Sequence, residues 1–425
     1  MRRRFLLSVL ASDLVVLASG MVAASLVTFD TPLPWGARPG ASIWPLIGLT
    51  AGGVVLGSYL SARASVLGVP RPSYGRAVAI TTTAVATVAV GLVLFRVYWS
   101  RPFLFETMGV FLVGALAHRA LRRRKPWTER MILISSEKGL VDDMRSTQHA
   151  DVMAVYDPSG DPPTEHPPPG VTLTLDLRPV LSEEMARYVS SWNLAGFPVR
   201  ALGNVYEEHT GRLPIVHLAE GWELTAPVSR NSYAPVKRVL DVTFVLVTSP
   251  LWLFLCGLIW LLVRVDSKGP AIFRQERVGR GGETFTLYKF RTMVEDADAD
   301  GPQFTVVGDS RLTRAGRLLR KIRLDELPQL FNVLKGDLSL VGPRPEQPAF
   351  VEQFAAGIPF YRYRHLIRPG VTGWAQVNYG YADDQADTVE KLTYDLYYVK
   401  LMSPWLDLQI LGKSVWTVLS GFGAQ

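Results

Sequence analysis

The sequence predicts a membrane protein of mixed α and α/β structure, built from three parts in chain order. Two observations indicate this. Apolar residues, 48% of the 425 residues, are concentrated in the first 118 residues and in one run near 240–263. Between them, short apolar runs alternate with helical stretches from Arg130 onward. We therefore expect a four-helix transmembrane region over 1–125, a small α/β domain over 126–228 and a mostly helical domain over 229–425.

The charge and the cysteine content narrow the classes of partner and compartment. The net charge is +7, and many arginines stand beside apolar segments. This pattern favours acidic lipid headgroups or nucleotide phosphates as partners, and no nucleic acid. Cys256 is the one cysteine, which excludes a disulfide framework and is compatible with a reducing compartment.

Four apolar stretches in the first part are each close to the ~20 residues that cross a bilayer. They cover 5–28, 43–61, 77–95 and 102–118. The first follows three arginines like a signal peptide, but its length and the spans that follow favour a retained anchor. Basic residues gather in alternate loops, so both ends of the region are predicted to be cytoplasmic. We expect Asp13 and Glu106 to be single charges near an interface or a helix contact.

The middle part predicts a Rossmann-like domain without a dinucleotide site. Strands are expected at 131–134, 152–156, 171–175 and 197–201, separated by helices near 138–147 and 182–194. A dinucleotide site needs a glycine-rich turn after the first strand, and only Gly139 stands there. Regulation, or contact within a homodimer, is the role expected of this domain.

The run 242–263 is long enough to cross a membrane, but both of its flanks are basic. Ser249 and Pro250 lie near its centre, where proline removes a backbone hydrogen bond and kinks a helix. A re-entrant helix over about 238–264, which returns to the cytoplasmic side, satisfies both observations. A fifth, kinked transmembrane helix is the alternative.

Two adjacent carboxylates, Asp325 and Glu326, follow the basic residues Arg320 and Lys321. The pattern predicts a helix with Asp325 as N-cap, Pro328 in the first turn and a stop at Gly336. A carboxylate at a helix N-terminus beside cations stays ionised where phosphates bind. The pair is therefore a candidate nucleophile or metal ligand, and an ordinary capped surface helix is the alternative.

Three further patterns in the C-terminal part suit phosphate or membrane contacts. A basic amphipathic helix near 312–322 suits an interface of anionic headgroups. Arg344 stands between two prolines, which fix the backbone for a bidentate phosphate contact. The loop 296–300 resembles an Asp-x-Asp metal site, although an acidic solvated loop explains it as well.

The motifs at 289–293, 324–330, 332–337 and 341–345 together resemble one family. It is the bacterial sugar transferases, the monotopic polyprenyl-phosphate phosphoglycosyltransferases. The resemblance covers about 233–422, and the preceding spans and α/β domain resemble those of its large members, which start exopolysaccharide or O-antigen synthesis.

The resemblance implies transfer of a sugar 1-phosphate from a UDP-sugar to undecaprenyl phosphate, releasing UMP, on the cytoplasmic face of the inner membrane. Asp325 is then the nucleophile that forms a phosphosugar-aspartyl intermediate, and Glu326 holds Mg²⁺. Arg320 and Arg344 clamp phosphates. The remaining substrate-site candidates are Lys289, Arg291, Lys335, Asp337, Arg368 and Gln376.

Two other functions are compatible with the sequence alone. A processive, metal-dependent glycosyltransferase would use the loop 296–300 instead of Asp325 and would release UDP. A membrane scaffold would bind a sugar nucleotide without turning it over. The sequence does not identify the sugar; large members of the family commonly use UDP-glucose or UDP-galactose.

Overall fold

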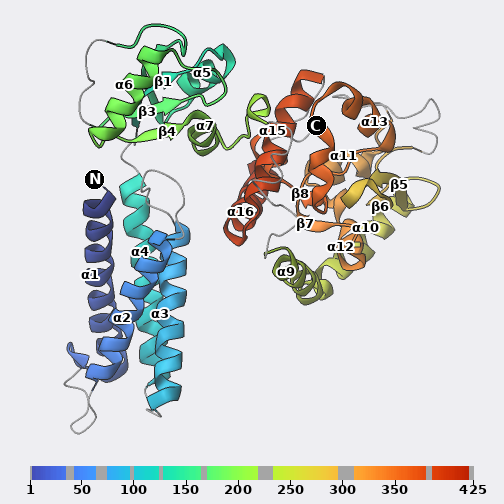
Figure 1. The fold of residues 1–425 in the computed structure, drawn as a ribbon. Helices are drawn as coiled ribbons and strands as arrows, with labels where there is room; N and C mark the ends of the chain where they lie inside the picture. Colours follow the sequence, from blue (N-terminus) through green and yellow to red (C-terminus); the bar gives the residue numbers. More distant parts are fainter. Residues whose placement is uncertain are drawn as a thin grey trace. The chain divides into compact units, whose positions relative to one another are not determined.

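The computed structural model describes residues 2–34, 43–63, 74–95, 100–123, 128–163, 170–218, 233–294, 311–379 and 385–420. These residues form two compact units, Met1–Thr128 and Glu129–Gln425. Figure 1 traces the helices and strands of both units along the chain.

The first unit consists of four helices at the predicted positions. They are α1 (Arg2–Phe29), α2 (Trp44–Arg63), α3 (Tyr74–Phe95) and α4 (Arg101–Arg123). By length and composition α1, α3 and α4 can each cross a membrane, and the apolar part of α2 is shorter. Outside this unit, the helix Ser249–Asp266 is also long and apolar enough to cross. A Cβ on Gly53 would lie 2.6 Å from the Ala84 Cα, so the backbones of α2 and α3 meet through a glycine. Small residues at such a crossing are typical of membrane helices.

The prediction that Asp13 carries a single charge is wrong. Both nitrogens at the end of Arg119 bind the Asp13 carboxylate, at 2.9 and 2.8 Å, and both side chains are buried between α1 and α4. Glu106 is a helix contact, as expected, because its carboxylate accepts a hydrogen bond from Thr28 at 2.9 Å. The Asp13–Arg119 pair joins residues 106 positions apart, and only the packing of the helices brings them together.

Asp13→Leu is expected to destabilise the first unit by about 3–5 kcal/mol, because it leaves the Arg119 guanidinium buried without its counter-charge. The double variant Asp13→Leu with Arg119→Leu should lose much less, because no buried charge remains. Thermal unfolding of the detergent-solubilised protein measures both. A single variant as stable as the double variant would contradict an ion pair of structural importance.

The second unit begins with a parallel α/β domain, as the strand and helix pattern predicts. Its sheet has the order β2-β1-β3-β4. The strands are β1 (Glu129–Ile134), β2 (Ala150–Tyr156), β3 (Thr172–Leu175) and β4 (Val199–Ala201), and the helices are α5 (Lys138–Ser146), α6 (Glu183–Leu194) and α7 (Leu202–Thr210). Met131 and Leu133 pack with α5 and α7, whereas Ile132 and Ile134 pack with α6. Successive strand residues point to opposite faces, so both faces of the sheet are covered.

The C-terminal domain is mostly helical, with two small two-stranded sheets. Antiparallel β5 (Ile272–Val278) and β6 (Thr284–Phe290) form one, and parallel β7 (Ser339–Val341) and β8 (Gly370–Thr372) form the other. The helices are α9 (Tyr233–Val247), α10 (Ser249–Asp266), α11 (Arg314–Lys321), α12 (Gln329–Lys335), α13 (Pro348–Gly357), α14 (Trp374–Asn378), α15 (Gln385–Leu401) and α16 (Pro404–Ser420). Short 3₁₀ helices are η2 (Ile215–His217), η4 (Arg280–Gly282), η5 (Leu324–Glu326) and η6 (Tyr361–Leu366).

The long apolar run near 240–263 is broken at Thr248, as the central proline predicts. Pro250 lies in the first turn of α10, where its missing N–H costs no helical bond. The Thr248 and Ser249 hydroxyls donate to the carbonyls of Phe244 and Leu246, each at 2.7 Å. Side chains therefore satisfy carbonyl groups at the junction of the two helices.

Both helices of the broken run are held by the same domain. On α9, the Lys237 ammonium lies 2.7 Å from the carboxylate of Asp407 in α16. On α10, the Trp252 ring packs edge-on against Phe331 of α12, with centroids 4.9 Å apart. The rest of the run exposes large apolar side chains, among them Phe244, Val247, Leu251, Phe254, Leu261 and Val265.

Candidate active site

The carboxylate pair, Asp325 and Glu326, lies in the 3₁₀ helix η5 and not at the start of an α-helix. Asp325 is therefore not an N-cap, and α12 begins only at Gln329. The difference arises because Arg323 takes a left-handed conformation, with φ of 56°, which starts the 3₁₀ helix one residue before Asp325. The predicted stop at Gly336 is confirmed, with φ of 102°. About 120° separates adjacent residues in a 3₁₀ helix, so the two carboxylates point in different directions.

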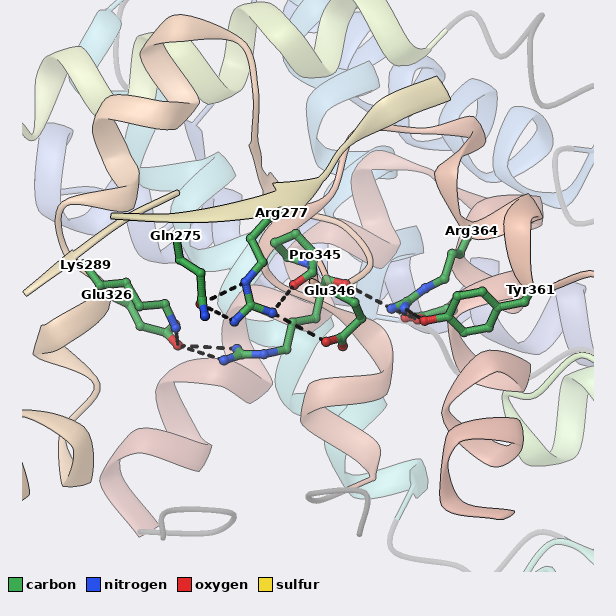
Figure 2. Close-up of polar contacts among 10 residues, drawn as sticks. Gln275, Arg277, Lys289, Glu326, Pro345, Glu346, Tyr361 and Arg364 are labelled. Atoms are coloured by element: carbon green, nitrogen blue, oxygen red, sulfur yellow. Dashed lines mark hydrogen bonds and ion pairs between the residues drawn. The ribbon is translucent and has the colours of Figure 1, made fainter. Parts of the chain in front are cut away.

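Both carboxylates are buried, each 8% exposed, and cations surround them. Glu326 Oε1 lies 3.3 Å from Arg344 Nη1 and 3.6 Å from Lys289 Nζ. Lys289 comes from β6, and Figure 2 shows its side chain converging with that of Glu326. The structure thus brings two predicted site residues, Lys289 and Arg344, to the same carboxylate oxygen of Glu326, which is itself a predicted site residue.

The surroundings move the pKa values of the two carboxyl groups in opposite directions. Burial raises the pKa of Asp325, and the charge of Glu326 raises it further, although Lys289, Arg320 and Arg344 oppose this. Burial also raises the pKa of Glu326, but Arg344 and Lys289 outweigh burial and hold it well below its usual range. Glu326 is therefore ionised at neutral pH, and Asp325 has the higher pKa of the two carboxyl groups.

Lys289 is the third titrating group of the site. Burial lowers the pKa of its ammonium to about 8, while the charge of Glu326 opposes the shift and that of Arg344 adds to it. A lysine in this condition carries its charge at neutral pH and loses it under mildly alkaline conditions.

Arg320 reaches the site on α11, the basic helix that the sequence predicts. A Cβ on Gly316 would lie 2.0 Å from the Thr292 carbonyl oxygen, so only glycine lets α11 approach this closely. One turn later, Arg320 Nε donates to the Thr292 hydroxyl at 2.9 Å. The contact holds the guanidinium where its charge lowers the pKa of Asp325.

Arg344 stands on a turn of three residues, 344–346, whose successive carbonyls are all held. Arg364 Nη2 donates to the Arg344 carbonyl at 3.0 Å, and Arg277 Nη1 donates to the Pro345 carbonyl at 3.1 Å. The backbone N–H of Val278 donates to the Glu346 carbonyl at 2.9 Å. Figure 2 shows Arg277 and Arg364 approaching this turn from either side. The flanking prolines predict a rigid turn, and the two arginines supply its support.

Arg277 and Arg364 were missed by the sequence reasoning. Arg277 is also held by Gln275, whose Oε1 accepts from Nε at 3.1 Å and from Nη2 at 2.6 Å. Arg364 is buried, and its Nη2 lies 2.7 Å from the Asp395 carboxylate of α15. No local pattern marks either residue, because each is defined by partners from distant elements.

The remaining predicted substrate residues contact other partners. Arg291 donates to the carbonyl and hydroxyl of Ser267 at 2.9 and 2.8 Å. Arg368 Nε donates to the Gly336 carbonyl at 3.1 Å, at the end of α12. The other contacts are Lys335 with Asp337 at 3.1 Å, Asp337 with Asn332 at 3.1 Å, and Gln376 with the Val371 carbonyl at 3.4 Å.

Within the described part of the chain, none of these contacts joins the five residues Arg291, Lys335, Asp337, Arg368 and Gln376 to the carboxylate pair. Their roles toward a substrate stay predictions. The acidic loop 296–300 lies outside the described residues.

The carboxylate pair has the chemistry of a magnesium site. Mg²⁺ prefers hard oxygen ligands and is commonly held by one or two carboxylates together with substrate phosphates. Glu326 is ionised at neutral pH, so its carboxylate fits the predicted role of Mg²⁺ ligand. Among the described residues one other group has metal-ligand composition, namely Glu129, Glu208 and His209. Arg200 contacts both of its carboxylates, at 3.3 and 2.7 Å, so this group too is paired with a cation.

Comparisons with known proteins agree with the motifs. A family model described as bacterial sugar transferase matches residues 232–421. The chain is 47% identical over 245 residues to a UDP-N-acetylgalactosamine-undecaprenyl-phosphate N-acetylgalactosaminephosphotransferase of Aeromonas hydrophila, with 58% of each protein covered. It is 38% identical over 213 residues to a UDP-glucose:undecaprenyl-phosphate glucose-1-phosphate transferase of Xanthomonas campestris pv. campestris, covering 49% of this chain and 43% of that protein. The chain thus spans about half the length of these two relatives.

A UDP-glucose:undecaprenyl-phosphate glucose-1-phosphate transferase of Caulobacter vibrioides is 42% identical to the chain over 200 residues. The match covers 46% of this chain and 73% of the Caulobacter protein. The match therefore covers more than two thirds of the Caulobacter protein, and the chain belongs to the bacterial sugar transferase family.

Proposed function

We propose that this protein transfers a sugar 1-phosphate from a UDP-sugar to undecaprenyl phosphate and releases UMP. The observation that carries the proposal is the buried carboxylate pair, in which Glu326 is neutralised by Arg344 and Lys289 while Asp325 is the more basic group. Such a site suits an anionic diphosphate and a carboxylate nucleophile. The names of the relatives support the same class of reaction.

In the first step an Asp325 carboxylate oxygen attacks the β-phosphorus of the UDP-sugar. The bond from that phosphorus to the bridging oxygen breaks, and UMP leaves with the electron pair. A phosphosugar remains joined to Asp325. Arg344 and Arg320 bind the phosphate oxygens, whose charge shifts toward the leaving group as this bond breaks.

In the second step a phosphate oxygen of the lipid attacks the same phosphorus. The bond to Asp325 breaks, the carboxylate is restored, and the sugar diphosphate lipid is formed. Glu326 would hold the cation, and bound Mg²⁺ would supply positive charge to the diphosphate oxygens. Glu326 itself does not react and remains ionised throughout.

We propose that α9 and α10 enter the cytoplasmic leaflet of the inner membrane and return, which would bring the lipid phosphate to the carboxylate pair. The exposed apolar side chains of both helices support this, as does the attachment of each helix to the same domain. Cysteines introduced at positions 230 and 270, in a Cys256→Ser background, should be labelled from the same side of the membrane. Labelling from opposite sides would make the run a true crossing.

The reaction is tested by incubating the purified protein with sugar-labelled UDP-sugars, without acceptor. The panel includes UDP-N-acetylgalactosamine and UDP-glucose, because the relatives' names contain these sugars. We expect label retained on the protein, stoichiometric UMP release, and discharge of the label when undecaprenyl phosphate is added. Release of UDP would favour a processive glycosyltransferase, and binding without turnover would favour a scaffold.

The pH profile of kcat/KM is expected to be bell-shaped. Attack requires the Asp325 carboxylate, whose pKa is raised, so activity should fall with acidification at a pH above the ordinary aspartate pKa of about 3.9. Loss of the Lys289 ammonium, with its pKa of about 8, should reduce activity on the alkaline side.

Lys289→Arg tests the fall in activity on the alkaline side of the profile, the alkaline limb, because arginine keeps its charge at every accessible pH. The alkaline limb should disappear and the acid limb should remain, measured from about pH 5 to about pH 9. An alkaline limb that is unchanged in this variant would contradict the role given to Lys289.

A further inference from the structure

We infer that the linking segment, residues 211–218 between α7 and the family-matched region, positions Arg344. The inference rests on the proposed function only in assigning Arg344 to the substrate. The linking segment lies before residue 232, where the family match begins. Its side chains nevertheless form part of the core beneath the site.

The core of the C-terminal domain includes Leu213. The Leu213 side chain is 2% exposed and shares a hydrophobic cluster with Val278 and Tyr361. Its backbone N–H donates to the Thr393 carbonyl of α15 at 3.0 Å. Leu213 therefore occupies a defined place between β5, η6 and α15.

Two members of this cluster support the 344–346 turn, Val278 directly and Tyr361 through Arg364. Val278 donates its backbone N–H to the Glu346 carbonyl at 2.9 Å. The Tyr361 hydroxyl accepts a hydrogen bond from Arg364 Nη1 at 2.7 Å, and Arg364 Nη2 donates to the Arg344 carbonyl at 3.0 Å. Figure 2 shows the ring of Tyr361 beside the Arg364 guanidinium. Two routes therefore lead from the cluster that contains Leu213 to the 344–346 turn, one through Val278 and one through Tyr361 and Arg364.

The α/β domain fixes the position of the linking segment. Glu207 of α7 binds Lys400 of α15, with oxygens 2.7 and 3.0 Å from Nζ. Arg212 lies 3.3 Å from Asp143 of α5 and 3.0 Å from Glu390 of α15. The Gly211 carbonyl accepts a hydrogen bond from Trp374 Nε1 at 2.8 Å. Glu207 and Arg212 are thus both bound to α15, which also carries Asp395, the partner of Arg364.

Leu213→Ala tests the inference in the full-length protein. The smaller side chain lets the Tyr361 ring and Arg364 shift, so the Arg344 guanidinium is held less firmly at Glu326. We expect the rate of the first step to fall roughly 10- to 100-fold, as small displacements at a reacting centre do. Leu213→Met, which keeps most of the volume, should retain most of the rate.

Leu173→Ala is the matched control, because Leu173 of β3 is equally buried but packs with α6, on the face of the sheet away from α7. Hydrogen exchange of the Val278 amide, which donates to the Glu346 carbonyl, gives a readout that does not depend on catalysis. Exchange there should rise in Leu213→Ala and stay unchanged in Leu173→Ala, at a temperature well below the unfolding midpoint of either variant.

An Arg344→Ala background separates positioning from general loosening. If Leu213 acts through Arg344, Leu213→Ala should have little further effect on the rate in that background. A full additional loss, or equal effects of Leu213→Ala and Leu173→Ala, would overturn the inference. If the wild type transfers no sugar phosphate but exchange still rises as expected, the proposed function fails and the positioning role stands.

Discussion

Asp325→Asn is expected to lower kcat by at least about 10⁴-fold and to abolish retention of labelled sugar phosphate on the protein. Asparagine has nearly the same shape as aspartate but offers no anionic oxygen to attack phosphorus. The neighbouring cations remain, so a UDP-sugar should still bind. Rapid-quench measurement of UMP release, with equilibrium binding of the UDP-sugar, separates the two effects.

Asp387→Asn serves as the control for Asp325→Asn. Asp387 is an aspartate of the same domain, in α15, and its carboxylate accepts a hydrogen bond from the Tyr379 hydroxyl at 2.7 Å. Its replacement should leave labelling of Asp325 in place. Full activity of the Asp325→Asn variant would exclude the aspartyl intermediate, and the acidic loop 296–300 would then be the next candidate.

Glu326→Gln is expected to lower kcat by about 10²- to 10³-fold and to weaken the dependence of the rate on Mg²⁺. The substitution removes the anion that Arg344 and Lys289 share, at 3.3 and 3.6 Å. Titration of the rate against Mg²⁺ concentration measures the change in cation dependence.

We also expect Glu326→Gln to change the pH profile of kcat/KM. Glu326 raises the pKa of Lys289 against the effect of burial, so its loss should lower that pKa below about 8. The alkaline limb should therefore move to lower pH. The acid limb should also move to lower pH, because Glu326 contributes to the raised pKa of Asp325.

Glu346→Gln provides a matched control for Glu326→Gln. Glu346 is a partly buried glutamate of the same region, 3.6 Å from Arg277. Its replacement should leave the Mg²⁺ dependence and both limbs of the profile near those of the wild type. An equal loss of cation dependence in the two variants would contradict the assignment of Glu326 as the metal ligand.

Much of the local structure could be read from the sequence because it depends on neighbouring residues. The four apolar helices of the first unit, the strands of the α/β domain and the break before Pro250 all follow from periodicity, length or a proline. The basic helix α11 and the stop at Gly336 follow from the same kind of pattern. The start of α12 did not, because the left-handed Arg323 gives residues 324–326 a 3₁₀ conformation.

The sequence by itself determined the apolar helices of the first unit, the α/β domain, the family and the carboxylate pair, because each depends on residues close together along the chain. Only the tertiary structure decided which cations share Glu326, that Asp13 has a partner, and that Arg277 and Arg364 support Arg344. These contacts join residues from 18 to 106 positions apart. Such pairs depend on how helices and strands pack, and the packing of the whole domain leaves no local pattern at either partner.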